Sequence, residues 1–440
     1  MPKAKPRPSN QTITGLQLIN FKCFADSGHI PLAPLTLVFG RNNTGKSSVL
    51  HSLLLMRQTM DAIVQGPRLN IRGPYYEGGA YSDIVHMHKA SRALRLAFSV
   101  RTQDEQDGEV AFEFSSDEPE LPRLTLIRIT IKRTHVVEMR RGRGAGGPFE
   151  LYIDETKIPG KQLYFPRAGL LPVFSPLLEM PAVDQAEKIL NTFRVILSRL
   201  RGISAFRRQP ERRYEYQGRL PDAPDLHGDR AVNAIIEDSL KRDGGSLISE
   251  VNRWLKEIGR VRFMSVRPIS RVARMFEVRM RDTDSERWAN FADVGFGIGQ
   301  AFPVFVEGLR TPVGGTFLVQ EPEIHLHPDA QLAMGEFLVE LALSGRNVIV
   351  ETHSENLLLR VRTLIASSKG PNKGHGKHLT PDKVSLLHVG KSETGEGRIK
   401  RLSLDELGQI ENWPAGFMEE AANERLRLLH EMARASRSRA

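Results

Sequence analysis

Disulfides, membrane spans and a secretory signal are all missing from this 440-residue sequence. Its only cysteine is Cys23, which excludes a disulfide within the chain and is typical of a protein in a reducing compartment. No apolar run is long enough to cross a bilayer. Residues 1–10 carry lysine, arginine and proline where a secretory signal would have an apolar core. We therefore expect a cytoplasmic protein with no membrane partner.

Acidic residues are in short supply relative to basic ones. The chain has 62 lysines and arginines against 52 aspartates and glutamates, a formal net charge of +10. This surplus is compatible with nucleic acid or another acidic partner, although charge alone indicates only non-specific attraction. The hydrophobic fraction of 40% is ample for a sizeable core and argues against overall disorder.

A glycine-rich phosphate-binding loop is the most informative motif present. It covers Gly40–Ser47, between a predicted buried strand at 35–39 and a predicted helix at 48–63. In such a loop backbone N–H groups surround phosphates, Lys46 contacts the β- and γ-phosphates, and the Ser47 hydroxyl coordinates Mg²⁺. The strand, loop and helix order favours this site over a plain glycine and asparagine turn. The expected nucleotide contacts are Gly40, Asn42, Asn43, Thr44, Gly45, Lys46, Ser47 and Ser48.

A predicted strand at 316–319 ends in the acidic segment Gln320–Glu323. We expect this strand to lie beside the loop strand, because such a neighbour delivers a carboxylate to the Mg²⁺ shell in phosphate-loop enzymes. Glu321 is the candidate that polarises the attacking water; the alternative is that these acids only end the strand and cap the next helix. His325 and His327 have the spacing of two metal ligands, but no third ligand stands at a diagnostic spacing, so a zinc site is not favoured.

Two further segments complete the predicted site. A buried strand at 347–351 stops at Thr352–Ser354, and ligands are contacted at the carboxyl ends of such strands, so we expect His353 to sense the terminal phosphate. A packed or surface histidine is the alternative. The glycine-spaced turn Asp293–Gln300 opens an apolar helix whose N-terminus suits an anion, unless the glycines serve only close packing. The expected contacts in this turn are Gly295, Gly297, Gly299 and Gln300.

The remaining sequence predicts two kinds of structure around this site. Alternating apolar and polar residues between 94 and 139 predict an antiparallel β-meander. Helical periodicity predicts helices at 182–201, 231–241 and 247–258. No heptad pattern is sustained across this region, so we expect a compact insertion and no long coiled-coil arm.

Taken in order, these segments resemble the ATP-binding-cassette class of ATPases, in the branch that includes the SMC, RecF and OLD-type heads. The segments that carry the resemblance are Ile19–Phe24, Gly40–Ser48, the signature Asp293–Gln300, the acidic Walker B strand Phe317–Pro328, and the switch segment Thr352–Ser354. More narrowly, Gln320–Pro328, Glu351–Glu355 and Leu407–Phe417 look like those of a poorly characterised prokaryotic family of AAA or ABC-type ATPases. Members of that family are often associated with mobile-element or phage-defence loci.

The resemblance implies an α/β fold of the P-loop NTPase type, an ABC-type head with an antiparallel β-meander and a compact α/β insertion. It implies ATP and Mg²⁺ as cofactors, with Lys22 among the nucleotide contacts and Ser47 and Gln320 at the metal. It also implies that two heads sandwich ATP, the phosphate loop of one facing the signature of the other, and that hydrolysis opens the dimer.

Two residues depart from the pattern of that class. Gln320 stands where an acid is usual, and an amide brings no charge to Mg²⁺, which predicts slow turnover. Glu323 is a possible compensating acid, so both Glu321 and Glu323 stay open as the catalytic carboxylate. The serine usual in the signature has no clear counterpart, since Gly297 and Gly299 occupy this region.

The expected division of the chain has five parts. They are a flexible basic tail at 1–10, the N-terminal part of the ATPase head at 11–100, a β-meander and helical insertion lobe at 101–285, the C-terminal part of the head with signature, Walker B strand and switch histidine at 286–390, and a family-specific segment with a basic tail at 391–440.

Two basic segments are candidates for contacts with DNA. The stretch 194–219 interleaves eight arginines with Tyr214 and Tyr216, which suits phosphate contacts and base stacking. A solvated, salt-bridged surface is equally compatible with it. The second candidate patch consists of Lys132, Arg133, Arg140, Arg141 and Arg143.

The expected function is that of an ATP-hydrolysing enzyme that forms a homodimer or higher oligomer through its ATP site. It would drive or gate a DNA-related process, such as anti-phage or mobile-element defence or DNA repair, through a separate effector protein such as a nuclease. The alternative is a nucleotide-dependent scaffold or switch that hydrolyses little ATP and regulates a partner protein.

Overall fold

The computed structural model describes the greater part of the chain. The described residues are 11–63, 66–116, 122–142, 147–160, 163–166, 169–176, 178–219, 223–241, 245–259, 261–270, 272–283, 287–368, 378–413, 424 and 427–432. The expected basic tail 1–10, Arg143 of the second basic patch and residues 414–417 of the family-like segment lie outside them.

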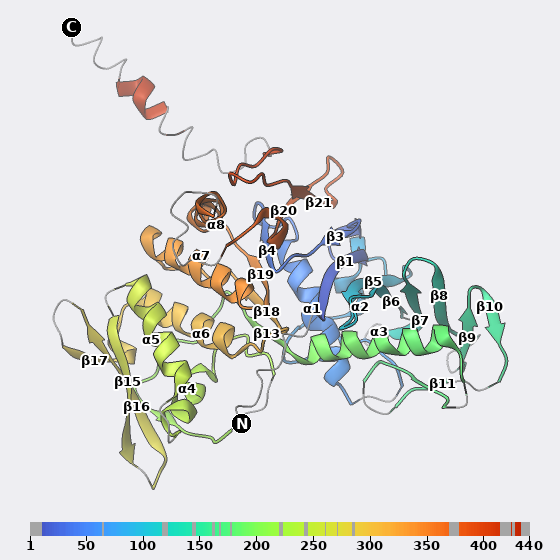
Figure 1. Ribbon diagram of the computed structural model, residues 1–440, viewed down its shortest axis with the longest axis horizontal. Coiled ribbons are helices and arrows are strands. Elements are labelled where there is room, and N and C mark those ends of the chain that lie inside the picture. Colours follow the sequence, from blue (N-terminus) through green and yellow to red (C-terminus); the bar gives the residue numbers. More distant parts are fainter. Residues whose placement is uncertain are drawn as a thin grey trace.

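A six-stranded sheet lies at the centre of the molecule (Figure 1). Its order is β13 (Leu200–Ile203), β18 (Thr316–Gln320), β19 (Asn347–Glu351), β4 (Leu35–Phe39), β20 (Val384–Lys391) and β21 (Gly397–Leu402). The first five strands are parallel, and β21 is antiparallel to β20. The strands β4, β18 and β19 are almost entirely buried and apolar, as strands covered on both faces must be.

The order of these strands corrects one expectation. The strand that ends in Gln320 does not lie beside the loop strand, because β19 pairs with β18 on one side and with β4 on the other. Adjacent strands lie about 4.8 Å apart, so Gln320 is two strand spacings from the phosphate-loop strand. On the side towards β18, the strand that lies next to the loop strand is β19, which ends in Glu351.

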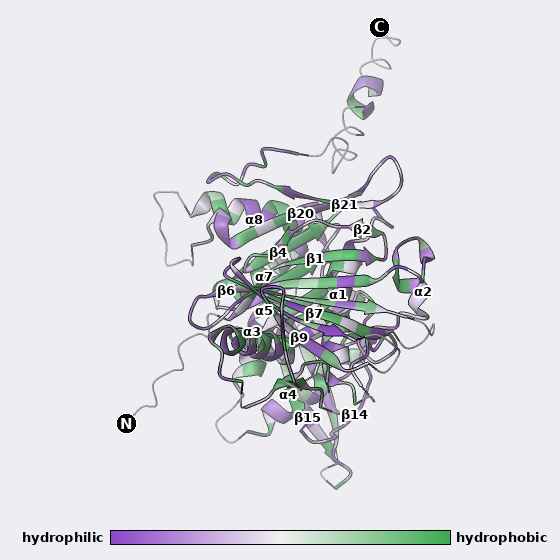
Figure 2. Cartoon of the chain, turned by 90° about the vertical axis from the view of Figure 1, so that its right-hand side faces the viewer, coloured by the Kyte–Doolittle hydropathy of each residue, from purple (hydrophilic) through white to green (hydrophobic). Residues whose placement is uncertain are grey.

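The predicted β-meander is present and forms a second, larger sheet with the N-terminal strands. Its order is β10 (Thr156–Ile158), β9 (Phe149–Ile153), β8 (His135–Arg141), β7 (Arg123–Ile131), β6 (Asp107–Ser115), β5 (Leu94–Arg101), β1 (Thr12–Phe21) and β2 (Phe24–Asp26), with β3 (Ile30–Pro31) paired to β1. All its pairings are antiparallel. Figure 2 shows green, hydrophobic strands of this sheet inside and purple segments towards the outside.

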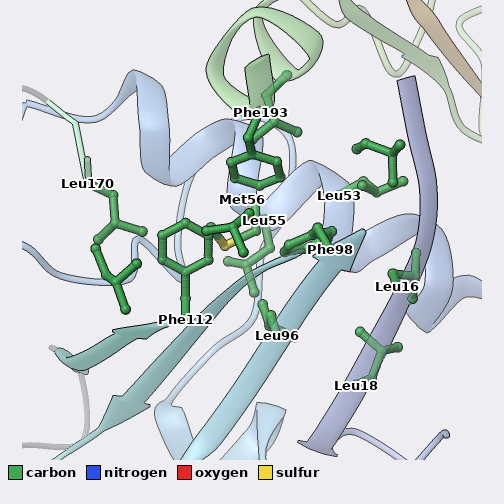
Figure 3. Packing of buried hydrophobic residues seen from close by; sticks show 14 of the residues in the cluster. Leu16, Leu18, Leu53, Leu55, Met56, Leu96, Phe98, Phe112, Leu170 and Phe193 are labelled. Carbon is green, nitrogen blue, oxygen red and sulfur yellow. The ribbon is translucent and has the colours of Figure 1, made fainter. Parts of the chain in front are cut away.

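A long helix and the phosphate-loop helix pack on this sheet. Helix α3 (Pro181–Ser198) runs along it (Figure 1). The Phe193 ring of this helix lies 5.0 Å from that of Phe98 and 5.6 Å from that of Phe112. Helix α1 (Lys46–Asp61) contributes Leu55 and Met56 to the same core (Figure 3). Burial of such side chains contributes about 1.5–3 kcal/mol each.

The helix predicted at 182–201 ends at Ser198, because the next residues form β13 at the edge of the central sheet. This strand falls within the segment expected to be an insertion, yet it pairs with β18. The rest of that segment forms α4 (Ala231–Ser239), α5 (Ser246–Ile258) and a small antiparallel sheet of β14 (Tyr214–Glu215), β16 (Met275–Asp282), β15 (Val261–Ser270) and β17 (Trp288–Asn290).

Helix α6 (Phe296–Arg310) continues the signature turn, α7 (Pro328–Leu343) follows the acidic segment, and α8 (Glu355–Ser367) follows the switch segment. Trp254 of α5, Phe305 of α6 and Phe337 of α7 pack against one another in a second hydrophobic core, with ring centroids 4.8–6.3 Å apart. Short elements complete the fold: α2 (Tyr81–Ile84), η1 (His86–His88), β11 (Leu163–Tyr164), β12 (Val173–Phe174), η2 (Phe291–Asp293) and η3 (Pro381–Lys383).

The architecture is α/β. A parallel sheet in which a phosphate loop joins a central strand to the following helix is a P-loop NTPase fold, here of the ABC head type with an antiparallel β-meander and a compact α/β insertion. No described helix is both long and apolar enough to cross a membrane.

Candidate functional site

The phosphate loop closes between β4 and α1, as predicted. Both glycines of the loop have positive φ angles, 150° at Gly40 and 102° at Gly45. A Cβ atom at Gly40 would lie 2.1 Å from the Val389 carbonyl oxygen, and one at Gly45 would lie 2.1 Å from the Cys23 sulfur. Both positions therefore need glycine for backbone conformation and for space.

Polar side chains of the loop bond back to its own backbone. The Thr44 hydroxyl and the Lys46 ammonium each donate to the Arg41 carbonyl, both at 2.9 Å. Burial lowers the pKa of Lys46, while the nearby carboxylates of Glu351 and Glu321 oppose that shift. A cationic group thus lies across the loop, where it is available to a phosphate.

Three side chains from three elements converge beside the loop. The Ser47 hydroxyl donates to Glu351 Oε1 at 2.7 Å, and the Gln320 side-chain amide donates to Glu351 Oε2 at 2.8 Å. A hydroxyl, a carboxylate and an amide oxygen are ligand types that Mg²⁺ accepts, so this set fits the metal expected with a nucleotide. Glu351 is not among the site residues predicted from the sequence, although its position directly before Thr352 is a signal for it.

Glu321 and His353 lie close together at the ends of β18 and β19. Glu321 has a φ angle of 45°, and its Oε1 is 3.9 Å from His353 Nε2. Their side chains are 31% and 37% exposed, so both are open to a ligand. Burial and the charge of Lys46 lower the pKa of His353, with Glu321 and Glu351 opposing, which keeps the imidazole neutral at pH 7.

Glu323 lies in a different environment and is only 7% exposed. Its Oε1 accepts from the Thr352 hydroxyl at 2.6 Å and from the His353 backbone N–H at 2.7 Å. Its Oε2 is buried and has no hydrogen-bond partner within the described structure. Burial raises the pKa of this carboxyl, despite the opposing hydrogen bonds. Glu323 therefore holds the switch segment in place.

The signature turn leads into α6 at Phe296. A Cβ atom at Gly297 would lie 2.4 Å from the His325 carbonyl oxygen, and one at Gly299 would lie 2.9 Å from Pro210, whereas Gly295 has open space around it. Close packing thus accounts for two of the three glycines. The Phe296 ring is half exposed and stands edge-on to the His325 ring at 4.6 Å.

One expected binding residue, Lys22, has its described contacts outside the phosphate loop. Its ammonium lies 3.4 Å from the Asp83 carbonyl oxygen and 5.5 Å from the centre of the Tyr76 ring. In the part of the chain described here, no three histidine, cysteine, aspartate or glutamate side chains form a group that could hold a metal.

The first basic segment is largely engaged within the protein. Arg207 is buried and donates to the backbone carbonyls of Gln300, Gln320 and Glu321 at 2.7–3.2 Å, which ties the start of α6 to the end of β18. Burial lowers the pKa of Arg207 to about 10, so it is still cationic at neutral pH. Arg201 forms a buried ion pair with Glu307 at 2.8 Å.

The exposed members of the same segment are also largely paired. Arg208 and Arg212 lie 3.3 and 2.5 Å from Asp229 and Asp293. The Tyr214 hydroxyl accepts from the Glu211 backbone N–H, and the Tyr216 ring stands edge-on to Phe276. The salt-bridged alternative therefore describes much of this segment, while Arg194, Arg213 and Arg219 are exposed.

Comparison with known proteins gives one family model that matches part of the chain and several similar solved structures. Residues 173–360 match a family model described as "AAA domain, putative AbiEii toxin, Type IV TA system". This range contains the signature, the acidic strand and the switch histidine, and it begins after the phosphate loop. No curated protein matches the sequence.

Several solved structures of SMC heads are similar to the chain. An SMC head bound to the C-winged helix domain of ScpA has 11% identity and a TM-score of 0.45, and covers 89% of this chain and 98% of its own. The SMC head domain from Thermotoga maritima has 10% identity and a TM-score of 0.40, with 88% and 98% covered. An SMC head with an extended coiled coil, bound to the C-terminal domain of ScpA derived from Pyrococcus furiosus, has 9% identity and a TM-score of 0.43, with 96% and 100% covered.

Proposed function

We propose that this protein is a Mg²⁺-dependent ATPase. The observation that carries the proposal is that β4, β18 and β19 end together: Lys46, Glu321 and His353 lie within electrostatic reach of one another, and Ser47 donates a hydrogen bond to the neighbouring Glu351. These residues supply a cation, a metal ligand, a carboxylate and a neutral imidazole, which is the set that phosphoryl transfer to water requires. The match of residues 173–360 to an AAA domain supports the same conclusion.

Each residue has a defined task in this proposal. Lys46 and the backbone N–H groups of the loop bind the ATP phosphates, and Ser47 holds Mg²⁺, which when bound neutralises charge on the β- and γ-phosphates. Glu321 orients a water and accepts its proton as the water oxygen bonds to the γ-phosphorus and the bond to the bridging oxygen breaks, releasing ADP. Neutral His353 donates a hydrogen bond to the γ-phosphate.

The local geometry supports Glu321 over Glu323 as the catalytic carboxylate. Both hydrogen bonds to Glu323 Oε1 come from Thr352 and His353, and burial raises the pKa of its carboxyl, which disfavours the charged form. Glu321 is partly exposed and lies next to His353. Glu323 acts on the reaction indirectly, by fixing the backbone that carries His353.

The proposal includes a dimer in which each ATP lies between two copies. The start of α6, with Gly295 in open space and Phe296 half exposed, is accessible on the surface of the chain. A helix N-terminus of this kind offers free N–H groups to a γ-phosphate on a second copy. If the two copies contact each other only while ATP is bound between them, hydrolysis of ATP would open the dimer.

A DNA-related process with a separate effector completes the proposed function. The words "AbiEii toxin" and "Type IV TA system" in the description of the matched family support a role in defence. The net charge of +10 supports nucleic acid as a partner, although many arginines of the first basic segment are already paired. If arginines contact DNA phosphates, the affinity for DNA should fall steeply as the salt concentration rises. A salt-independent affinity would remove nucleic acid as a proposed partner.

A nucleotide-dependent scaffold with little hydrolysis is the second candidate. The observation that favours it is Gln320, which brings an amide to a position where an acid is usual. In a scaffold of this kind, restoring an acid with Gln320→Asp should raise ATP turnover sharply. No gain would favour a native site that is already competent.

Two variants test the proposed ATPase directly. We expect Lys46→Ala to lose ATP binding, because it removes the cation from the loop, and Glu321→Gln to retain ATP that the wild type would hydrolyse. Retained nucleotide can be identified by chromatography after gel filtration, with the exposed Glu393→Gln as a control for the loss of a carboxylate. Equal turnover and equal retention in all four proteins would contradict the assignment.

A further inference from the structure

Glu351 occupies the end of β19, a strand that pairs directly with the phosphate-loop strand β4. In the register of the central sheet it pairs with Val38 of β4 on one side and with Gln320 of β18 on the other. Val38 lies two residues before Gly40, where the loop begins. The position therefore bridges the phosphate loop and the acidic strand.

The carboxylate of Glu351 is buried but has no cationic partner at contact distance. It is 4% exposed, and in the described structure no lysine, arginine or histidine nitrogen lies within 4.0 Å of it. Its only hydrogen-bond donors there are the uncharged side chains of Ser47 and Gln320. Burying a carboxylate costs several kcal/mol unless a charge or metal compensates it. Lys46 interacts with Glu351 electrostatically but does not contact it, so these surroundings suit a further cation next to Ser47.

We propose that Glu351 supplies the metal-shell carboxylate that Gln320 lacks. The two residues have exchanged roles across neighbouring strands: Glu351 supplies the negative charge next to Ser47, and the Gln320 amide holds Glu351 Oε2 so that Oε1 faces the Ser47 hydroxyl. Gln320 is then a positioning residue. This inference rests on the proposed ATPase and extends it to the residues that hold the metal.

If Glu351 supplies the carboxylate, Gln320 no longer predicts slow turnover. One carboxylate is present in the metal shell, as in a site with an acid at 320, and only the strand that supplies it differs. An aspartate at 320 would place a second carboxylate beside Glu351 and remove the hydrogen bond from the amide. On this basis the site is complete as it stands, and Gln320→Asp should give no gain in turnover.

The test measures the metal dependence of nucleotide binding. Titrations of the full chain with a fluorescent ATP analogue, in excess Mg²⁺ and in EDTA, give the factor by which Mg²⁺ strengthens binding. We expect Glu351→Gln to bind as the wild type does in EDTA and to lose about tenfold or more of the Mg²⁺ factor, the scale on which metal sites respond to such changes. The exposed Glu393→Gln should match the wild type in both conditions.

A charge exchange distinguishes a metal ligand from a structural carboxylate. The double variant Gln320→Glu with Glu351→Gln keeps one acid and one amide in contact and should recover much of the lost Mg²⁺ factor. Competition by Mn²⁺, followed through the paramagnetic signal of the free ion, should show the same order of affinities without any turnover.

Three results would overturn the inference. They are an unchanged Mg²⁺ factor in Glu351→Gln, a loss of binding in EDTA as large as the loss in Mg²⁺, or an exchange variant no better than Glu351→Gln. In each case the wild type still binds ATP, so the proposed ATPase survives. If the wild type binds no ATP with or without Mg²⁺, the proposed function and this inference both fail.

Discussion

At the scale of single residues, the acids of the site divide by burial. Glu321 is partly exposed beside a neutral histidine, whereas Glu323 is buried with one oxygen bonded to the switch segment and the other without a partner in the described chain. In the sequence Glu321 and Glu323 stand only two residues apart, so their spacing does not tell which of them is the catalytic carboxylate. Their side-chain environments depend on how β18 and β19 meet, which only the folded chain shows.

The raised pKa of Glu323 predicts a pH dependence of stability. A carboxyl whose pKa is raised in the folded state binds its proton more tightly there than in the unfolded chain, where the ordinary value is 4.5. Stability from this group is therefore fully present below pH 4.5 and is lost as pH rises through the folded pKa. Glu323→Gln cannot ionise, and its Oε1 can still accept from Thr352 and the His353 backbone.

Urea unfolding at a series of pH values from 4.5 to 8 checks this prediction. The stability of Glu323→Gln relative to the wild type should rise with pH, with Glu393→Gln as the exposed control. A relative stability that falls with pH would mean that Glu323 is held charged in the fold, and would reopen its assignment.

At the scale of elements, strand order decides which residues meet. The phosphate loop, its strand and helix, the acidic strand and the switch strand can all be predicted from local patterns in the sequence. The placement of β19 between β4 and β18 cannot, because the hydrophobic pattern of a buried strand says nothing about its neighbours. This one feature moves Gln320 away from the loop and brings Glu351 to Ser47.

Close packing of the signature helix gives a prediction for its glycines. Gly297→Ala would place a Cβ atom 2.4 Å from the His325 carbonyl oxygen, so the start of α6 must shift away from the segment that follows β18. Such overpacking costs about 1–3 kcal/mol. Gly295→Ala, two residues earlier, meets nothing within 4 Å and should change stability by less than about 0.5 kcal/mol.

The free energy of unfolding of the two glycine variants, measured in urea, separates the two roles of the turn. Equal destabilisation of both variants would show that a requirement of the turn other than space accounts for the glycines. A neutral Gly297→Ala would show that the approach of α6 to His325 is not tight in solution.

At the scale of the whole molecule, two sheets share the phosphate-loop helix. Apolar side chains of α1 pack in the core of the antiparallel sheet. The N-terminus of the same helix carries Lys46 and Ser47 at the carboxyl ends of the parallel strands. The sequence predicts both sheets, since the meander alternates and the parallel strands do not. The pairing of β13 with β18 could not be foreseen, because four residues after a long helix carry no strong pattern.

The proposed ATP sandwich predicts a change in assembly. Glu321→Gln, which should retain ATP, is expected to be largely dimeric by light scattering with Mg²⁺-ATP and monomeric with ADP. Phe296→Asp, at the half-exposed start of α6, should remain monomeric in both. A mass that does not depend on the nucleotide would contradict dimerisation through the ATP site.

In the proposed function this chain hydrolyses ATP with Glu321 as the catalytic carboxylate. Steady-state release of phosphate at saturating Mg²⁺-ATP measures this hydrolysis in the wild type, in Glu321→Gln and in Glu323→Gln. We predict that Glu321→Gln loses at least about 100-fold of the rate, which corresponds to the lower range for a catalytic acid or base, while Glu323→Gln keeps a measurable rate. A wild type with no release above that of Lys46→Ala, or a Glu321→Gln variant as fast as the wild type, would contradict the account.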